Sequence, residues 1–132
     1  MNKWKIEATK HTPEIFFDND CHRLELKGES YPENITELSV PLFSWLENYF
    51  SESTCETLTV QIELHYFNSS SSKMLLDFFD RLEEEVVQKD RKIVVNWIYD
   101  PDNEVTQEYG EEFKEDLEAL PFYLVPRVGH LT

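Results

Sequence analysis

Residues 58–74 constrain the fold more than any other part of this chain. Over residues 58–67 apolar and polar side chains alternate, which predicts a half-buried β-strand with Tyr66 on the apolar side and Phe67 on the other. Asn68 and four serines follow, and from Met74 onward apolar residues recur at spacings of three and four, as on one face of a helix. The segment therefore predicts a strand that leads through a short polar junction into an amphipathic helix.

The remaining segments repeat this alternation of strand and helix. We expect two or three short strands between Trp4 and Leu26, with a hairpin turn at 18–20. The other expected elements are a structured loop at 28–34 (GESYPEN), a helix from Ser39 with Pro41 in its first turn, a buried strand at 91–99, a helix at 107–120 and a strand or extended tail at 121–125. The order is roughly β-β-(β)-α-β-α-β-α-β. We therefore predict an α/β (mixed α+β) fold with a partly parallel sheet and crossover helices.

Composition narrows the classes of partner. The 132 residues carry 27 acidic and 12 basic side chains, a net charge of −15, and 40% are hydrophobic. We expect one domain, 1–132. Its negative electrostatic potential disfavours nucleic acid and anionic membranes as primary partners. Without a signal-peptide-like or membrane-spanning apolar run in the sequence, we expect a cytoplasmic protein. Cys21 and Cys55 lie far apart and form no metal-binding motif, so we expect no cofactor.

The serines at 69–72 are the first candidates for function. Backbone N–H groups at the start of a helix are unpaired and attract anions, so phosphorylation there changes the surface charge without unfolding the protein. A phosphorylation switch and simple helix capping by Asn68 or one serine both fit this position.

Two other kinds of chemistry fit the sequence less well. A serine hydrolase needs a base and an oxyanion hole, but the chain has no Gly-x-Ser-x-Gly motif, and His65 is expected beside the polar residues of its strand. The segment from Asp100 to Glu111 spaces oxygen ligands like a calcium loop, but Val105 stands where glycine is needed. We expect a solvated acidic loop there, no metal site and no catalytic residue.

Several strings together resemble a known family. They are GESYPEN at 28–34, Pro41-Leu42 followed by Trp45-Leu46 and Tyr49, YFNSSSSK at 66–73, and Trp97-Ile98-Tyr99-Asp100 followed by EYGE at 108–111 and Phe113. In these the chain resembles the SiaC family of bacterial regulatory phosphoproteins. The resemblance implies a STAS-like domain without enzymatic activity. It also implies reversible phosphorylation by a cognate Ser/Thr kinase and a PP2C-like phosphatase, and an unmodified form that binds and activates a diguanylate cyclase, in c-di-GMP signalling.

The resemblance also implies which residue is modified. The family's phosphoacceptor follows the asparagine of the YFN string, which corresponds to Ser69, with Ser70 and Ser71 as alternatives. Lys73, one helical turn further on, either pairs with the phosphate or is an ordinary exposed charge. We expect the partner-binding surface to comprise Tyr31, Glu33, Asn34, Asn68, Ser69, Ser70 and Lys73. The alternative function is a small acidic scaffold or ligand-binding domain that has no phosphorylation switch.

Overall fold

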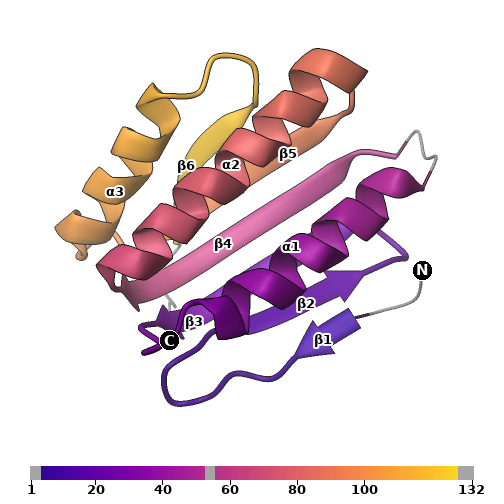
Figure 1. Ribbon diagram of the computed structural model, residues 1–132. Helices are drawn as coiled ribbons and strands as arrows, with labels where there is room; N and C mark the ends of the chain where they lie inside the picture. Colours follow the sequence, from indigo (N-terminus) through magenta and orange to yellow (C-terminus); the bar gives the residue numbers. More distant parts are fainter. Residues whose placement is uncertain (1–3, 53–55, 128–132) are drawn as a thin grey trace.

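The computed structural model of the protein describes residues 4–52 and 56–127. These residues form one six-stranded mixed sheet, with helices covering one of its faces (Figure 1). In chain order the elements are β1 (Trp4–Ile6), β2 (Glu14–Asp18), β3 (Arg23–Ser30), α1 (Thr36–Ser51), β4 (Leu58–Phe67), α2 (Ser69–Lys89), β5 (Ile93–Tyr99), α3 (Glu104–Glu115) and β6 (Phe122–Pro126).

The strands lie in the sheet in the order of the sequence, from β1 to β6. Strands β1, β2 and β3 are antiparallel, and the expected hairpin turn joins β2 to β3, where the Asp18 side chain accepts a hydrogen bond of 2.9 Å from Asp20 N–H. From β3 to β6 all pairs are parallel, and a helix makes each connection. Because such crossovers are right-handed and all proceed in one direction, the three helices cover the same face. The predicted mixed α/β order is confirmed.

The core lies between the sheet and the helices. Trp97 on β5 is fully buried, and its ring lies 6.5 Å from that of Phe79 on α2 and 5.3 Å from that of Phe113 on α3. Side chains on the opposite face of the sheet are half-exposed in β2, β4 and β5, as the burial pattern alternates along these strands. The helices thus supply the cover that one face of the sheet needs, and the other face remains open.

Two helices begin earlier than the sequence predicted. Helix α1 starts at Thr36, not near Ser39, because Asn34 Oδ1 accepts hydrogen bonds from Thr36 N–H at 3.1 Å and Thr36 Oγ1 at 2.6 Å; Pro41 therefore lies inside the helix. Helix α3 runs over 104–115, not 107–120, since the Asn103 side chain caps it. Most of the expected acidic loop at 100–111 is therefore helical, which corrects that prediction.

The ends of β3 and β4 also differ from the prediction. Residues 28–30 of the expected loop belong to β3, where Gly28 has a φ of 125° that suits glycine. The register then shifts, because Gly28 pairs with Leu64 but Glu29 pairs with Tyr66. This irregularity reverses the alternation, so that Tyr66 is exposed and Phe67 is buried, the opposite of our prediction.

Candidate partner-binding site

Asn68 organises the junction between β4 and α2, at the carboxyl end of the parallel strands. Its Oδ1 accepts hydrogen bonds from Ser71 N–H at 3.0 Å and from Ser70 Oγ at 3.1 Å, so it is the N-cap of α2. Its backbone N–H donates to Ser30 O at 3.0 Å, and its side-chain amide donates to Pro32 O at 3.4 Å. Asn68 thereby fixes the start of α2 against the segment that follows β3.

The serines at this junction occupy three different environments. Ser69 is exposed, and Ser70 is half-buried against Asn68. Ser71 is fully buried, donates to Ser30 O at 3.0 Å and shares a hydrogen bond of 2.7 Å with Ser30 Oγ. Of the three candidate acceptors, Ser69 is therefore the one whose side chain is exposed to solvent, and Ser71 is not accessible in this conformation.

The other predicted site residues, Tyr31, Glu33, Asn34 and Lys73, differ in how they contact the start of α2. The Tyr31 ring makes an edge contact with that of Tyr66, three residues before Ser69, at 5.6 Å between centroids. Glu33 and Asn34 are exposed on the connection from β3 to α1, and the Asn34 side chain accepts a hydrogen bond from Thr36 N–H at the start of α1. Lys73 is 78% exposed and lies 3.9 Å from Asp77 on α2. Tyr31 is thus linked to the end of β4 through Tyr66, and its neighbours Ser30 and Pro32 are linked to the start of α2 through Asn68.

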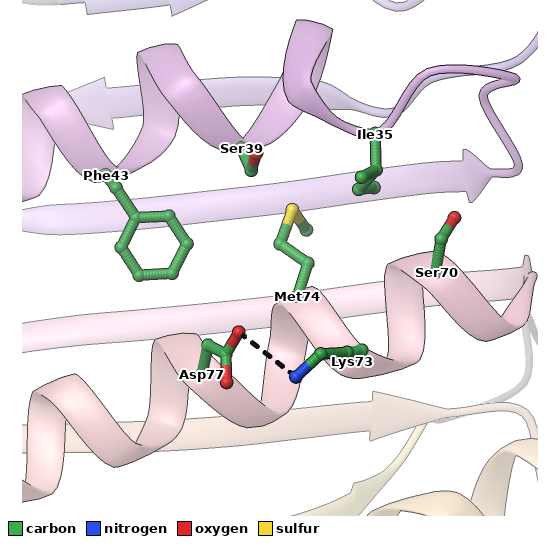
Figure 2. Close-up of a pocket in the computed structure, with 7 residues that line it drawn as sticks. All are labelled: Ile35, Ser39, Phe43, Ser70, Lys73, Met74 and Asp77. Atoms are coloured by element: carbon green, nitrogen blue, oxygen red, sulfur yellow. Dashed lines mark ion pairs between the residues drawn. The ribbon is translucent and has the colours of Figure 1, made fainter.

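Two hollows flank the start of α2. The first, of about 410 Å³, lies between α1 and α2 (Figure 2); Ile35, Ser39, Phe43, Ser70, Lys73, Met74 and Asp77 line it. The second, of about 720 Å³, lies between the end of β4 and α3; His65, Tyr66, Phe67, Asn68, Ser69, Asn103, Val105, Thr106 and Tyr109 line it. Ser70 lines the first hollow and Ser69 lines the second. The predicted acceptor Ser69 thus lies in the wall of one hollow, and the next residue lies in the wall of the other.

Hydrogen bonds and ring contacts hold the second hollow in place. Asn103 donates to His65 O at 3.1 Å and caps α3, and the Tyr109 ring lies 4.8 Å from that of Phe67. Tyr66 and Val105 remain 55% and 62% exposed at its rim. Exposed apolar side chains around a polar residue on a rigid frame are typical of a protein-binding surface.

Sequence reasoning missed most of this apolar surface. The apolar-polar pattern predicts Tyr66 on the buried face, because the irregularity in β4 leaves no sign in that pattern. The sequence singles out Val105 only as a mismatch to a calcium loop, because one apolar residue in a polar segment is no sign of a contact surface. Ile35, Phe43 and Met74 appear as ordinary apolar positions of amphipathic helices.

Acidic groups dominate the electrostatics of the helical side. Burial, together with the nearby carboxylates of Asp77, Glu83 and Asp116, raises the pKa of Asp80 on α2. Arg81, by hydrogen bonds of 2.7 and 2.9 Å, lowers the pKa of Glu47 on α1. Within residues 4–52 and 56–127, no group of three or more His, Cys, Asp or Glu is arranged to hold a metal ion. No helix in these ranges is long and apolar enough to cross a membrane.

Comparisons of the sequence with known proteins identify relatives of this chain. A sequence model of the SiaC family of regulatory phosphoproteins matches residues 6–127. An uncharacterized protein of Pseudomonas aeruginosa (strain UCBPP-PA14) is 38% identical over 122 residues, 92% of this chain and 94% of its own length.

Solved structures of SiaC have the same fold as this chain. The crystal structure of apo-SiaC from Pseudomonas aeruginosa matches with a TM-score of 0.84 and 36% identity, over 95% of this chain and 99% of that one. A chain in the crystal structure of the diguanylate cyclase SiaD in complex with its activator SiaC, from the same organism, matches with a TM-score of 0.85 and 36% identity, over 94% and 99% of the two chains.

Proposed function

Because this chain belongs to the SiaC family of regulatory phosphoproteins, we propose that it is an adaptor without enzymatic activity, whose unphosphorylated form binds and activates a diguanylate cyclase in the cytoplasm. The observation that carries the proposal is the similarity, over 94% of the chain, to a structure of a cyclase with its activator SiaC. The exposed apolar residues Tyr66 and Val105 beside Ser69 support a protein partner at this surface.

Ser69 is the proposed phosphoacceptor. It is the exposed serine at the start of α2, whereas modification of Ser71 would require breaking the buried hydrogen bonds to Ser30. A kinase needs the hydroxyl to reach its active site, and the first residue of a helix allows this without unfolding. A cognate Ser/Thr kinase would add the phosphate and a PP2C-like phosphatase would remove it.

The proposed switch is electrostatic. A phosphoserine carries a charge of about −1.5 to −2 near neutral pH, and the N–H groups at the start of α2 tolerate it. A partner that covers Ser69 and the neighbouring Tyr66 and Val105 would have to bury this charge in an apolar contact, which is costly. Lys73 lies at the helical spacing that would allow it to pair with the phosphate, in competition with Asp77.

Purified diguanylate cyclases of the source organism test the proposal. Each would be mixed with wild-type protein, Ser69→Ala and Ser69→Asp, and both binding and formation of c-di-GMP from GTP would be measured. We expect wild type and Ser69→Ala to activate one cyclase and Ser69→Asp to bind it at least about tenfold more weakly, a difference of about 1.4 kcal/mol.

Ser44→Asp is the matched control, because Ser44 is an exposed serine on α1 and lines neither hollow. It should activate as wild type does. If no cyclase responds, and protein from its native host carries no phosphate, the alternative of an acidic scaffold or ligand-binding domain replaces this proposal.

A further inference from the structure

The hollow between α1 and α2 has an apolar floor and a polar rim (Figure 2). Ile35 and Phe43 on α1 and Met74 on α2 supply the apolar side chains, and Met74 is only 5% exposed. Ser39 lies across the hollow from Met74, and Ser70 lies across from Ile35 (Figure 2). Small side chains at these two positions leave unfilled space where neighbouring helices usually interdigitate.

Fixed contacts close the far end of this hollow. The Phe43 ring meets that of Phe78 edge-on at 6.0 Å, and one turn further along α1 Glu47 accepts two hydrogen bonds from Arg81 on α2, at 2.7 and 2.9 Å. At the near end the hollow reaches Ser70, which follows the proposed acceptor in sequence. The space is therefore confined, and it is continuous with the junction that the proposed function assigns to the partner.

The charge around the hollow restricts what can enter it. Among the lining residues Lys73 is the single cation, and it already lies 3.9 Å from Asp77. Asp80 is exposed on the same helix, and Glu84 lies 3.2 Å from Arg81. The three helices carry twelve acidic and four basic side chains. On the open face of the sheet three ion pairs balance charge: Lys5 with Glu14, Arg23 with Glu25 and Arg127 with Glu63. The excess of acid thus lies on the helical side, where it attracts a basic segment.

We infer that the hollow between α1 and α2 receives a large apolar side chain, flanked by lysine or arginine, from the diguanylate cyclase. The inference rests on the proposed function and adds where and by what chemistry the cyclase is held. The apolar anchor fills the space over Met74 between Ser39 and Ser70, and the flanking cations face Asp77. A volume of about 410 Å³ is within the range of pockets that hold compact apolar groups.

Filling the hollow from within tests this inference. Ser39→Leu places a leucine in the unfilled space and leaves the acceptor and the charges unchanged. Ser44→Leu is the matched control, since it makes the same change on the exposed side of α1 outside the hollow. We expect Ser39→Leu to weaken cyclase binding at least about tenfold, as loss of an interface anchor does. Ser44→Leu should stay within about twofold of wild type.

A second measurement observes the hollow directly. The chain has two methionines, Met1 and Met74, so methyl-labelled methionine gives one NMR signal from the floor of the hollow and one reference. We expect unlabelled cyclase to shift or broaden the Met74 signal of wild-type protein. The same spectrum of phosphomimetic Ser69→Asp with cyclase should retain the free position.

The outcomes separate the two levels of the proposal. A cyclase that binds in a Ser69-dependent manner, with an unmoved Met74 signal and unaltered affinity for Ser39→Leu, overturns the hollow as the anchor site but leaves the proposed function standing. A Met74 signal that moves with the concentration of this chain alone assigns the hollow to a second copy and overturns the inference. If no cyclase binds wild-type protein, both proposals fail.

Discussion

An aspartate should be tolerated at position 69 and should strongly destabilise the protein at position 71, although the two serines are only two residues apart. Ser69 is exposed as the first residue of α2. Ser71 is fully buried against Ser30, with hydrogen bonds of 2.7 Å to its Oγ and 3.0 Å to its carbonyl oxygen. A carboxylate at 71 would face that carbonyl oxygen, which cannot donate a hydrogen bond.

The structure sets the expected magnitudes. Ser71→Ala leaves buried Ser30 groups without their partner, which costs about 1–3 kcal/mol of unfolding free energy. Ser71→Asp adds an unpaired buried charge, and we expect a total loss of at least about 4 kcal/mol. Because small domains have about 5–15 kcal/mol of stability in all, this variant should lose a large part of its stability. Ser69→Asp should stay within about 1 kcal/mol of wild type, since an acidic group suits the N-terminus of a helix.

Urea unfolding followed by tryptophan fluorescence gives the three free energies under one set of conditions. The order of stability should be wild type and Ser69→Asp together, then Ser71→Ala, then Ser71→Asp. Equal stability of the two aspartate variants would refute the reasoning, because it would mean that Ser71 is as accessible as Ser69. The acceptor could then not be chosen by burial.

Three further predictions concern the frame of the site. Asn68→Ala should lower the unfolding free energy by about 1 kcal/mol through loss of the cap, and an unchanged urea midpoint would contradict it. Gly110→Ala should cost about 1–3 kcal/mol, because a Cβ there would clash with the Trp97 ring and the Leu124 side chain; a thermal melting temperature equal to that of wild type would exclude this clash. Burial raises the pKa of Glu83, but hydrogen bonds from three backbone N–H groups at 118–120 outweigh it, so the pKa is lowered from its ordinary 4.5. The ionised Glu83 carboxylate therefore stabilises the protein at pH values above the pKa that it has in the unfolded chain, and this stabilisation is lost as the pH falls through its pKa in the folded protein. Glu83→Gln should destabilise the protein at about pH 7 and much less at about pH 3. An equal loss of stability at both pH values would contradict this role of Glu83.

The fold could be predicted largely from hydrophobic periodicity. The strand at 58–67 has the bounds the pattern predicted, because the apolar-polar alternation of the sequence covers the same ten residues. The helix starts at Thr36 and Glu104 were missed because Asn34 and Asn103 engage their helices through side-chain hydrogen bonds, which apolar spacing does not report. The reversal at Tyr66 depends on pairing with β3, far away in sequence.

The site could be predicted only in part, for a related reason. The position of the serines between a strand and a helix follows from local patterns, and the structure adds the difference in burial between Ser69 and Ser71. That difference arises because Ser30, at the end of the neighbouring strand β3, is hydrogen-bonded to Ser71. The hollows form between helices and strands that meet only in the folded chain, so Val105 and Phe43 carried no separate signal in the sequence.

Protein carrying genuine phosphoserine at position 69 tests the central claim most directly. Phosphoserine incorporated during synthesis gives a uniform sample, to be compared with unmodified protein for activation of the same diguanylate cyclase, before and after treatment with a PP2C-type phosphatase. We predict activation by unmodified protein, none by the phosphorylated form, and recovery after dephosphorylation. Equal activation by the phosphorylated and unmodified forms would contradict the account.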